Sequence, residues 1–142
     1  AQAQTSSGVE QIKQNGVLRV GVFGDKPPFG FIDENGKNAG FDIYIAKRLA
    51  KDLLGDESKI EFILTEAASR VEFLRSNKVD IIMANFTQTK EREEAVDFAK
   101  PYMKVSLGVV SPNGEIQSVE DLSIKARLQM CILVKITRIL SY

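Results

Sequence analysis

Short apolar runs alternate with segments of helical periodicity along residues 9–110, and this order is the feature that most constrains the fold. Runs typical of strands occur at Val17–Val22, Ile60–Leu64, Val79–Ala84 and Val105–Val110. Segments typical of helices occur at Val9–Asn15, Asp42–Leu54, Ala67–Ser76 and Thr89–Ala95. The alternation predicts an α/β fold with a mainly parallel sheet flanked by helices.

The segment Asp42–Leu54 has the clearest helical pattern. Its small and apolar residues recur at the spacing of one helix face, at Ala46, Leu49, Ala50 and Leu53. Gly55 follows at the position where a helix favours a left-handed residue, so we expect the helix to end there. Upstream, Asp33–Gly36 predicts a plain turn, because the alternating acids of a calcium loop are absent.

The composition excludes several classes of function. The 142 residues include no His, which removes the commonest general base and the commonest metal ligand. A single Cys excludes an internal disulfide and a multi-thiolate metal site. Nineteen basic residues balance nineteen acidic ones, so net charge gives no argument for nucleic-acid binding. No glycine-rich phosphate loop is present. We expect ligand binding without catalysis, cofactor or metal.

Ligands of parallel α/β sheets bind outside the carboxyl ends of the strands. In this sequence those ends are Phe23–Phe29, Thr65–Arg70 and Asn85–Arg92. These three segments are therefore the candidate binding loops.

The loop Asn85–Arg92 has the residue types of an anion site. Arg92 can form a two-pronged hydrogen bond to a carboxylate, and the Thr87 hydroxyl can donate to the same group. The loop also enters a predicted helix, whose first N–H groups attract negative charge. The alternative is that Thr89 caps the helix and Arg92 pairs with an acid nearby, Glu93 or Asp97.

Arg70 adds a second cation beside the second strand, with a plain surface arginine as the alternative. Four of the eight Phe residues lie within nineteen positions, at Phe23, Phe29, Phe31 and Phe41. Some must belong to the core, and one or two could wall a pocket. The residues themselves thus indicate a small anionic or zwitterionic ligand.

Four segments together resemble a known family: LRVGVFGDKPPFGF, GKNAGFDIYIAKRLAKDL, NKVDIIMANFTQTKEREEAVDFAKPYM and SVEDL. They are similar to the polar amino-acid type of bacterial extracellular solute-binding proteins, family 3, which feed ABC importers. The stretch EAASRVEFLRSNKVDIIMANFTQT is most similar to a cysteine-binding branch. One departure is Tyr44, where the family usually carries an acid; we expect this position on the helix exterior.

The resemblance implies a periplasmic-binding-protein-like fold of two lobes that close on a free L-amino acid. It implies that Arg92 binds the ligand α-carboxylate, helped by Thr87 and the backbone around Asn85. It also implies that Arg70 lines the pocket. The remaining members of the expected ligand-binding set are aromatic: Phe23, Phe29 and Phe86.

The resemblance further implies a permease partner in the inner membrane, a monomeric full-length protein, and a periplasmic or cell-envelope location. The resemblance leaves open whether a precursor carries a lipid anchor. Cysteine is the favoured ligand, and an acidic ligand such as aspartate stays open because of the second arginine. The alternatives in other classes are a non-binding antigenic fragment and an enzyme of the same fold, such as a dehydratase.

Along the chain we expect a flexible leader at 1–8, the first lobe at 9–104, and the hinge with the start of the second lobe at 105–122. Residues 123–142 do not fit the family pattern and carry a net charge of +4. They are either a helix or strand of the fold or a foreign ending, such as an out-of-frame product. We expect a truncated protein whose open half-site binds weakly or not at all, because exposed ion pairs are screened.

Overall fold

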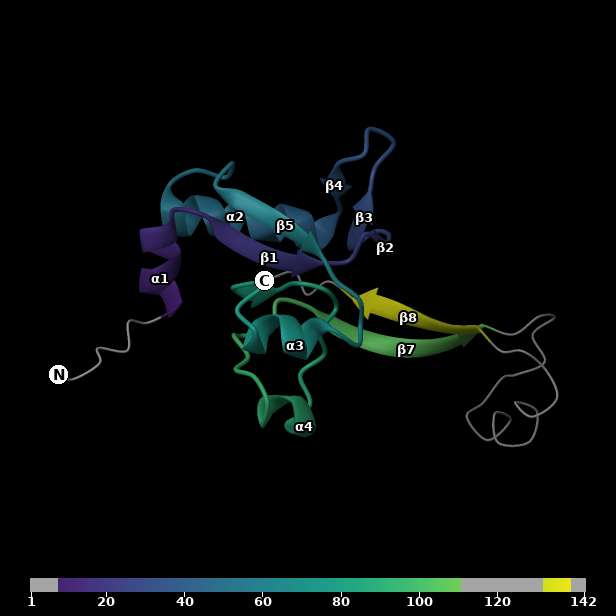
Figure 1. The fold of residues 1–142 in the computed structure, drawn as a ribbon. Coiled ribbons are helices and arrows are strands. Elements are labelled where there is room, and N and C mark those ends of the chain that lie inside the picture. The colour runs from purple at the N-terminus through teal and green to yellow at the C-terminus, as the bar shows by residue number, and fades with distance from the viewer. Residues whose placement is uncertain (1–7, 111–131, 139–142) are drawn as a thin grey trace. The chain divides into compact units, whose positions relative to one another are not determined.

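The computed structural model describes residues 8–110 and 132–138, and the chain divides into two units, residues 1–97 and 98–142. The first unit contains a three-stranded parallel sheet in the order β5-β1-β6 (Figure 1). These strands are β1 (Leu18–Val22), β5 (Ile60–Leu64) and β6 (Ile81–Ile82). The predicted α/β fold with a mainly parallel sheet is confirmed.

β6 is shorter than the six-residue strand that the sequence predicts. Its backbone pairing extends one residue beyond each end, because Asp80 N–H donates to Arg19 and Met83 N–H donates to Gly21, both at 2.9 Å. The chain then leaves the sheet at Asn85, whose φ of 48° is left-handed. The strand pairing therefore covers residues 80–83 of the predicted run 79–84, and the backbone turns shortly after that run ends.

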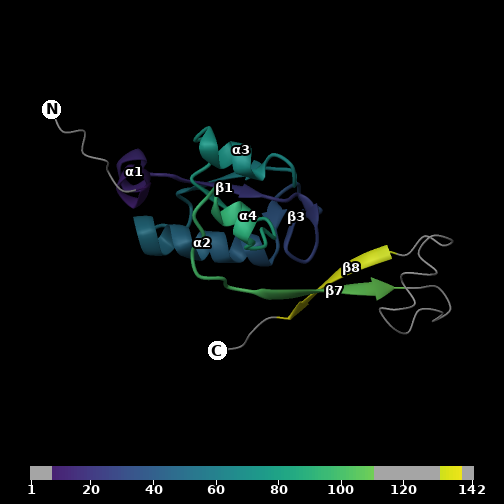
Figure 2. The same cartoon turned by 90° about the horizontal axis from the view of Figure 1, so that it is seen from below.

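Four helices accompany these strands in the described part of the first unit: α1 (Gly8–Asn15), α2 (Phe41–Leu54), α3 (Arg70–Arg75) and α4 (Lys90–Glu93). Figure 2 shows α2 and α3 on opposite sides of β1. α2 ends as predicted at Gly55, with φ of 77° and its N–H bonded to the Lys51 carbonyl at 2.8 Å. α3 and α4 are shorter than predicted, because Ser69 and Thr89 occupy the N-cap positions.

The core of the first unit lies between β1 and α2. Alternate residues of β1, namely Leu18, Val20 and Val22, are fully buried because they point to one face of the sheet. Ala46 and Ala50 of α2 are also fully buried, as the helical spacing predicts. Small residues on this helix face let the helix pack closely against the sheet.

A small antiparallel sheet connects β1 to α2. It contains β2 (Asp25–Lys26), β3 (Gly30–Ile32) and β4 (Asn38–Ala39). The Pro27–Pro28 peptide bond between β2 and β3 is cis. The turn predicted after β3 is confirmed, since the Asp33 carboxylate accepts the N–H groups of Asn35 and Lys37 at 2.9 Å each.

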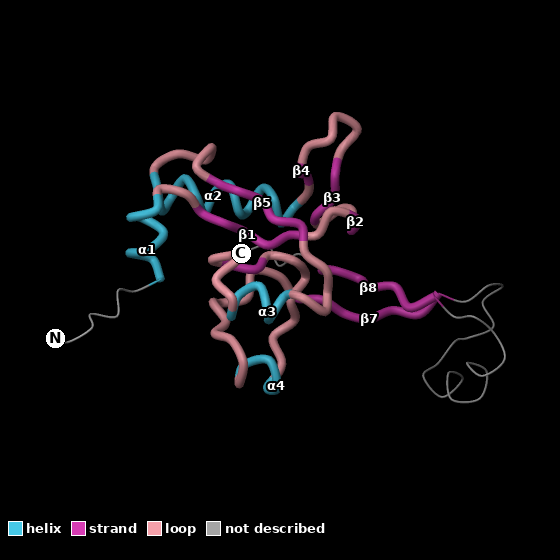
Figure 3. The backbone as a smooth tube through the Cα atoms, in the orientation of Figure 1, coloured by secondary structure: helices cyan, strands magenta, loops and turns pink. Residues whose placement is uncertain are grey.

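The described part of the second unit is one antiparallel pair, β7 (Lys104–Val110) with β8 (Ile132–Arg138). The two strands run side by side in Figure 3, with Lys104 opposite Arg138. The strand predicted at Val105–Val110 is confirmed, and part of the basic ending forms its partner. The spacing of Ser118 and Asp121 in the sequence also indicates a helix start, but both positions lie outside the described residues.

Candidate functional site

The carboxyl ends of β1, β5 and β6 lie at one edge of the sheet because the three strands are parallel and adjacent. The segments that follow them are 23–29, 65–70 and 83–92, and they include the three loops that the sequence predicts, 23–29, 65–70 and 85–92. Side chains from all three segments meet at this edge, as the contacts below show.

Arg70, the first residue of α3, turns inward and is only 7% exposed. Its guanidinium donates to three backbone carbonyls. Nε donates to Ala67 at 3.1 Å, and Nη1 donates to Ala84 at 2.9 Å and Asn85 at 3.3 Å. The alternative of a plain surface arginine is therefore wrong, and Arg70 joins the segment after β5 to the segment after β6.

Cations and aromatic rings alternate along this edge. The Cζ atoms of Arg70 and Arg92 lie 4.6 and 4.9 Å from the centroid of the same Phe86 ring. Arg70 Cζ also lies 5.6 Å from the Phe23 centroid, and Lys26 Nζ lies 5.8 Å from that centroid. Contacts of this kind stabilise by roughly 0.5–2 kcal/mol each. We call these five residues the cation–aromatic row.

Arg92 extends back along its own loop rather than toward an acid. Its Nη1 donates to the Thr87 carbonyl at 2.8 Å, so these two predicted site residues are in direct contact. The Thr89 hydroxyl accepts the Arg92 backbone N–H at 3.3 Å and thereby caps α4, as one alternative proposed. α4 has only four residues, so the predicted anion site depends on the arginine side chains and not on a helix terminus.

Neither Arg70 nor Arg92 forms an ion pair within the part of the chain that the structure describes. Glu93, one proposed partner of Arg92, instead accepts a hydrogen bond from the side-chain amide of Gln88. Burial, and to a lesser degree the charge of Arg92, lowers the pKa of Arg70, which still remains protonated at neutral pH. Two adjacent guanidiniums without a carboxylate favour an anion.

The structure brings together all seven predicted site residues, through side chains or through the backbone. Phe23, Arg70, Phe86 and Arg92 belong to the row, Thr87 contacts Arg92, and the Asn85 carbonyl contacts Arg70. Phe29 is half-buried, and its carbonyl accepts the Asp42 N–H at the start of α2. Its N–H donates to the carbonyl of Lys26, a member of the row, at 2.9 Å, so Phe29 joins the row through its backbone.

Sequence reasoning missed Lys26 as a member of the row. Lys26 pairs with its neighbour Asp25, which offsets its charge. Its only sequence signal is a position inside the predicted loop 23–29, because an isolated lysine before two prolines is otherwise an ordinary surface residue.

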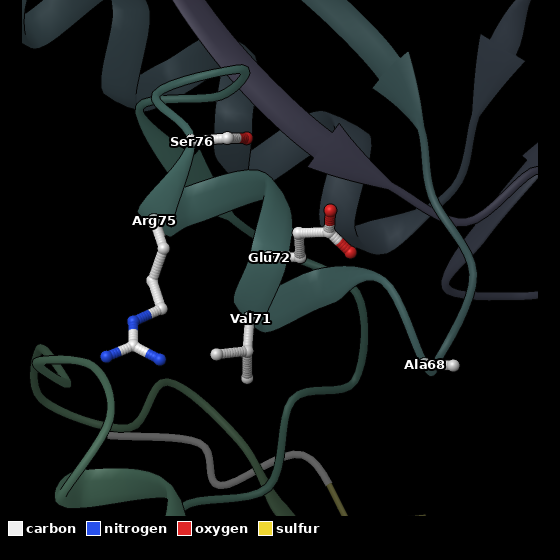
Figure 4. A pocket seen from close by; sticks show the side chains of 5 residues that line it. All are labelled: Ala68, Val71, Glu72, Arg75 and Ser76. Carbon is white, nitrogen blue, oxygen red and sulfur yellow. The ribbon is translucent and has the colours of Figure 1, made fainter.

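A separate shallow hollow of about 460 Å³ lies along α3 and is lined by Ala68, Val71, Glu72, Arg75 and Ser76 (Figure 4). Val71 and Arg75 extend to one side of the helix in Figure 4, whereas Glu72 extends to another. The lining has no aromatic wall and includes no member of the row. We therefore place the candidate site at the sheet edge.

Two further properties concern residues 8–110 and 132–138 only. They contain no cluster of three or more His, Cys, Asp or Glu side chains able to hold a metal ion. They also contain no helix with the length and apolar character needed to cross a membrane.

Comparison with known proteins agrees with this geometry. Residues 18–128 match the profile of bacterial extracellular solute-binding proteins, family 3. The glutamine-binding protein of Geobacillus stearothermophilus is 42% identical over 124 residues, which are 84% of this chain and 47% of that protein. The chain spans about half the length of this relative.

Two solved structures are informative. The cysteine-binding protein from Campylobacter jejuni has 67% sequence identity and a TM-score of 0.75, over 80% of this chain and 46% of that one. The arginine-bound form of domain 1 from TmArgBP, of T. maritima, has 38% identity and a TM-score of 0.60. That match covers 65% of this chain and 71% of that one.

Proposed function

The chain belongs to family 3 of the bacterial extracellular solute-binding proteins, and on this basis we propose that its first unit binds the carboxylate end of a free L-amino acid. The observation that carries the proposal is the pair of guanidiniums on the Phe86 ring, which have no acidic partner among the described residues. A ligand carboxylate supplies the missing negative charge.

In this proposal Arg92 is the direct carboxylate ligand. Its Nη1 is used by the Thr87 carbonyl, which leaves the Nε and Nη2 donors for a two-pronged contact. The Thr87 side chain is exposed and can add a hydroxyl donor. Phe86 is half-buried and offers apolar surface to the rest of the ligand, whereas Phe23 is 7% exposed and leaves little surface for direct contact. The backbone at Asn85 shapes the loop.

We favour L-cysteine as the ligand because of the 67% identity to a cysteine-binding protein. Glutamine is the second candidate, since a glutamine-binding relative is 42% identical. The wider proposal is the role that the resemblance implies: delivery of the amino acid to an ABC permease in the inner membrane.

The proposed contacts predict weak binding by this chain. Exposed ion pairs contribute only about 0–1 kcal/mol each, because water and salt screen them. The described residues also provide no identified acceptor for the ligand ammonium group. The arginine-bound domain 1 from TmArgBP supports the idea that a first domain alone can hold a ligand.

Substitution of Arg92 tests the proposal. We expect Arg92→Gln to weaken L-cysteine binding about fivefold, the upper end of what one exposed ion pair contributes. Isothermal titration of the 142-residue chain measures this loss. Arg48→Gln is the matched control, because Arg48 lies on α2 in an exposed pair with Asp52. Equal affinities for the Arg92 variant and the wild type contradict the proposal.

A further inference from the structure

Arg70 contacts the loop that carries Arg92 at two successive carbonyls. Ala84 and Asn85 lie 14 and 15 residues further along the chain, and both accept hydrogen bonds from the same Nη1. A third bond, from Nε to Ala67, fixes the guanidinium to its own segment. A planar group held at three carbonyls has little freedom to reorient.

The segment that Arg70 holds is conformationally unusual. Asn85 has a φ of 48°, in the left-handed region that costs a residue with a side chain roughly 1–2 kcal/mol. Such a conformation persists only where surrounding contacts stabilise it. The two bonds from Arg70 Nη1 go to the carbonyl of Ala84, which precedes this residue, and to the carbonyl of Asn85 itself. They therefore stabilise the left-handed turn directly.

Phe86 links Arg70 to Arg92. It directly follows the left-handed residue, so the turn determines the direction in which its ring projects. The Cζ atoms of Arg70 and Arg92 lie within 5 Å of the ring centroid, at 4.6 and 4.9 Å. A change in the ring position therefore changes the surface on which the Arg92 guanidinium packs.

We propose that Arg70 is a positioning residue, which sets the orientation of Arg92 by holding the turn at Asn85 and the Phe86 ring. Its 7% exposure leaves little of the side chain for direct contact with a ligand. The consequence for amino-acid affinity rests on the proposed function, whereas the effect on Arg92 is a property of the ligand-free protein.

Arg70→Lys tests this role, because lysine keeps the positive charge but lacks the planar fork. The first readout is the side-chain Nε–H resonance of Arg92 in the ligand-free 142-residue chain. In the wild type we expect this resonance to be displaced by the Phe86 ring. In Arg70→Lys we expect it to move to the position of an exposed arginine. The control Arg75→Lys, on the exposed part of α3, leaves the resonance unchanged.

Phe86→Leu is a second variant, which retains all three carbonyl bonds of Arg70 while removing the ring. We expect the Arg92 Nε–H resonance to lose the displacement that the ring causes. The backbone resonances show that this variant is folded. Phe86→Leu thus shows the size of the ring effect, and Arg70→Gln, which also lacks the planar guanidinium, replaces Arg70→Lys with the same expected change if the lysine variant fails to fold. An Arg92 resonance that is unaffected by either substitution overturns the proposal.

Titration with L-cysteine is the second readout. We expect Arg70→Lys to reduce affinity about threefold, and Arg92→Gln combined with Arg70→Lys to cause no further loss beyond Arg92→Gln alone. Full additivity of the two losses overturns the proposal, because it shows that Arg70 acts independently of Arg92. If the wild type binds no amino acid, the proposed function fails, while the ligand-free resonances still decide the role of Arg70.

Discussion

Arg19 shows at the residue scale how one side chain joins distant segments of the first unit. Its Nη2 and Nε donate to the Asp80 carboxylate at 2.7 and 3.2 Å, and its backbone N–H donates to the same group at 2.9 Å. Nη1 donates to the Asn77 carbonyl at 2.7 Å. Hydrogen bonding to Asp80 raises the pKa of Arg19 and so favours the charged guanidinium.

We expect Asp80→Ala to lower the free energy of unfolding by about 2 kcal/mol, because it leaves the Arg19 backbone N–H and guanidinium without their acceptor. Urea denaturation measures the change. Asp52→Ala is the control, since Asp52 is 68% exposed and lies 3.9 Å from Arg48. Its expected effect is below about 0.5 kcal/mol. Equal losses in both variants contradict this account of the Arg19–Asp80 pair.

At the scale of elements, Gly40 determines how the small antiparallel sheet meets α2. Gly40 has a φ of 116°, and a Cβ atom built there would lie 2.3 Å from the Phe29 carbonyl oxygen. The two N–H groups that follow it, of Phe41 and Asp42, donate to the carbonyls of Pro28 and Phe29 at 2.9 and 2.8 Å. A backbone this close leaves no space for a side chain.

We expect Gly40→Ala to lower the free energy of unfolding by more than about 3 kcal/mol, from a backbone clash added to an unfavourable φ. Gly36→Ala is the matched control, because Gly36 also has a positive φ, of 72°, but open space around its Cβ position. Its expected loss is about 1 kcal/mol. Urea midpoints compare the two, and a smaller loss at Gly40 than at Gly36 refutes the close-approach argument.

Elements with a repeating pattern could be predicted from the sequence. α2 extends over more than three turns, so Ala46 and Ala50 reveal its buried face and Gly55 its end. The same reasoning overextends α3 and α4. In these shorter segments the N-cap positions of Ser69 and Thr89 determine the helix start, and such positions look like ordinary loop residues in a sequence.

The candidate site was only partly predictable. The alternation of strands with helices and the anion-binding character of the loop Asn85–Arg92 follow from local patterns and from Arg92 itself. The inward orientation of Arg70 does not, because its acceptors lie 14 and 15 residues away and become neighbours only when β5 and β6 flank β1. The contact between the Lys26 ammonium and the Phe23 ring likewise forms only in the folded loop. Their spacing in the sequence does not predict it.

At the scale of the whole molecule, the chain combines a first unit bearing a cation–aromatic row with a second unit whose described part is one strand pair. The 142 residues have no net charge, yet two guanidiniums gather at one sheet edge without an acid beside them among the described residues. Local charge, not net charge, therefore determines what this surface attracts.

The most direct test is a backbone NMR titration of the wild-type chain with L-cysteine and, separately, with cysteamine, which lacks the carboxylate. We predict saturable shift changes centred on residues 85–92 with L-cysteine and none there with cysteamine, because the guanidiniums recognise the carboxylate. Equal shifts with both compounds, or saturable shifts elsewhere and none in this loop, contradict the account.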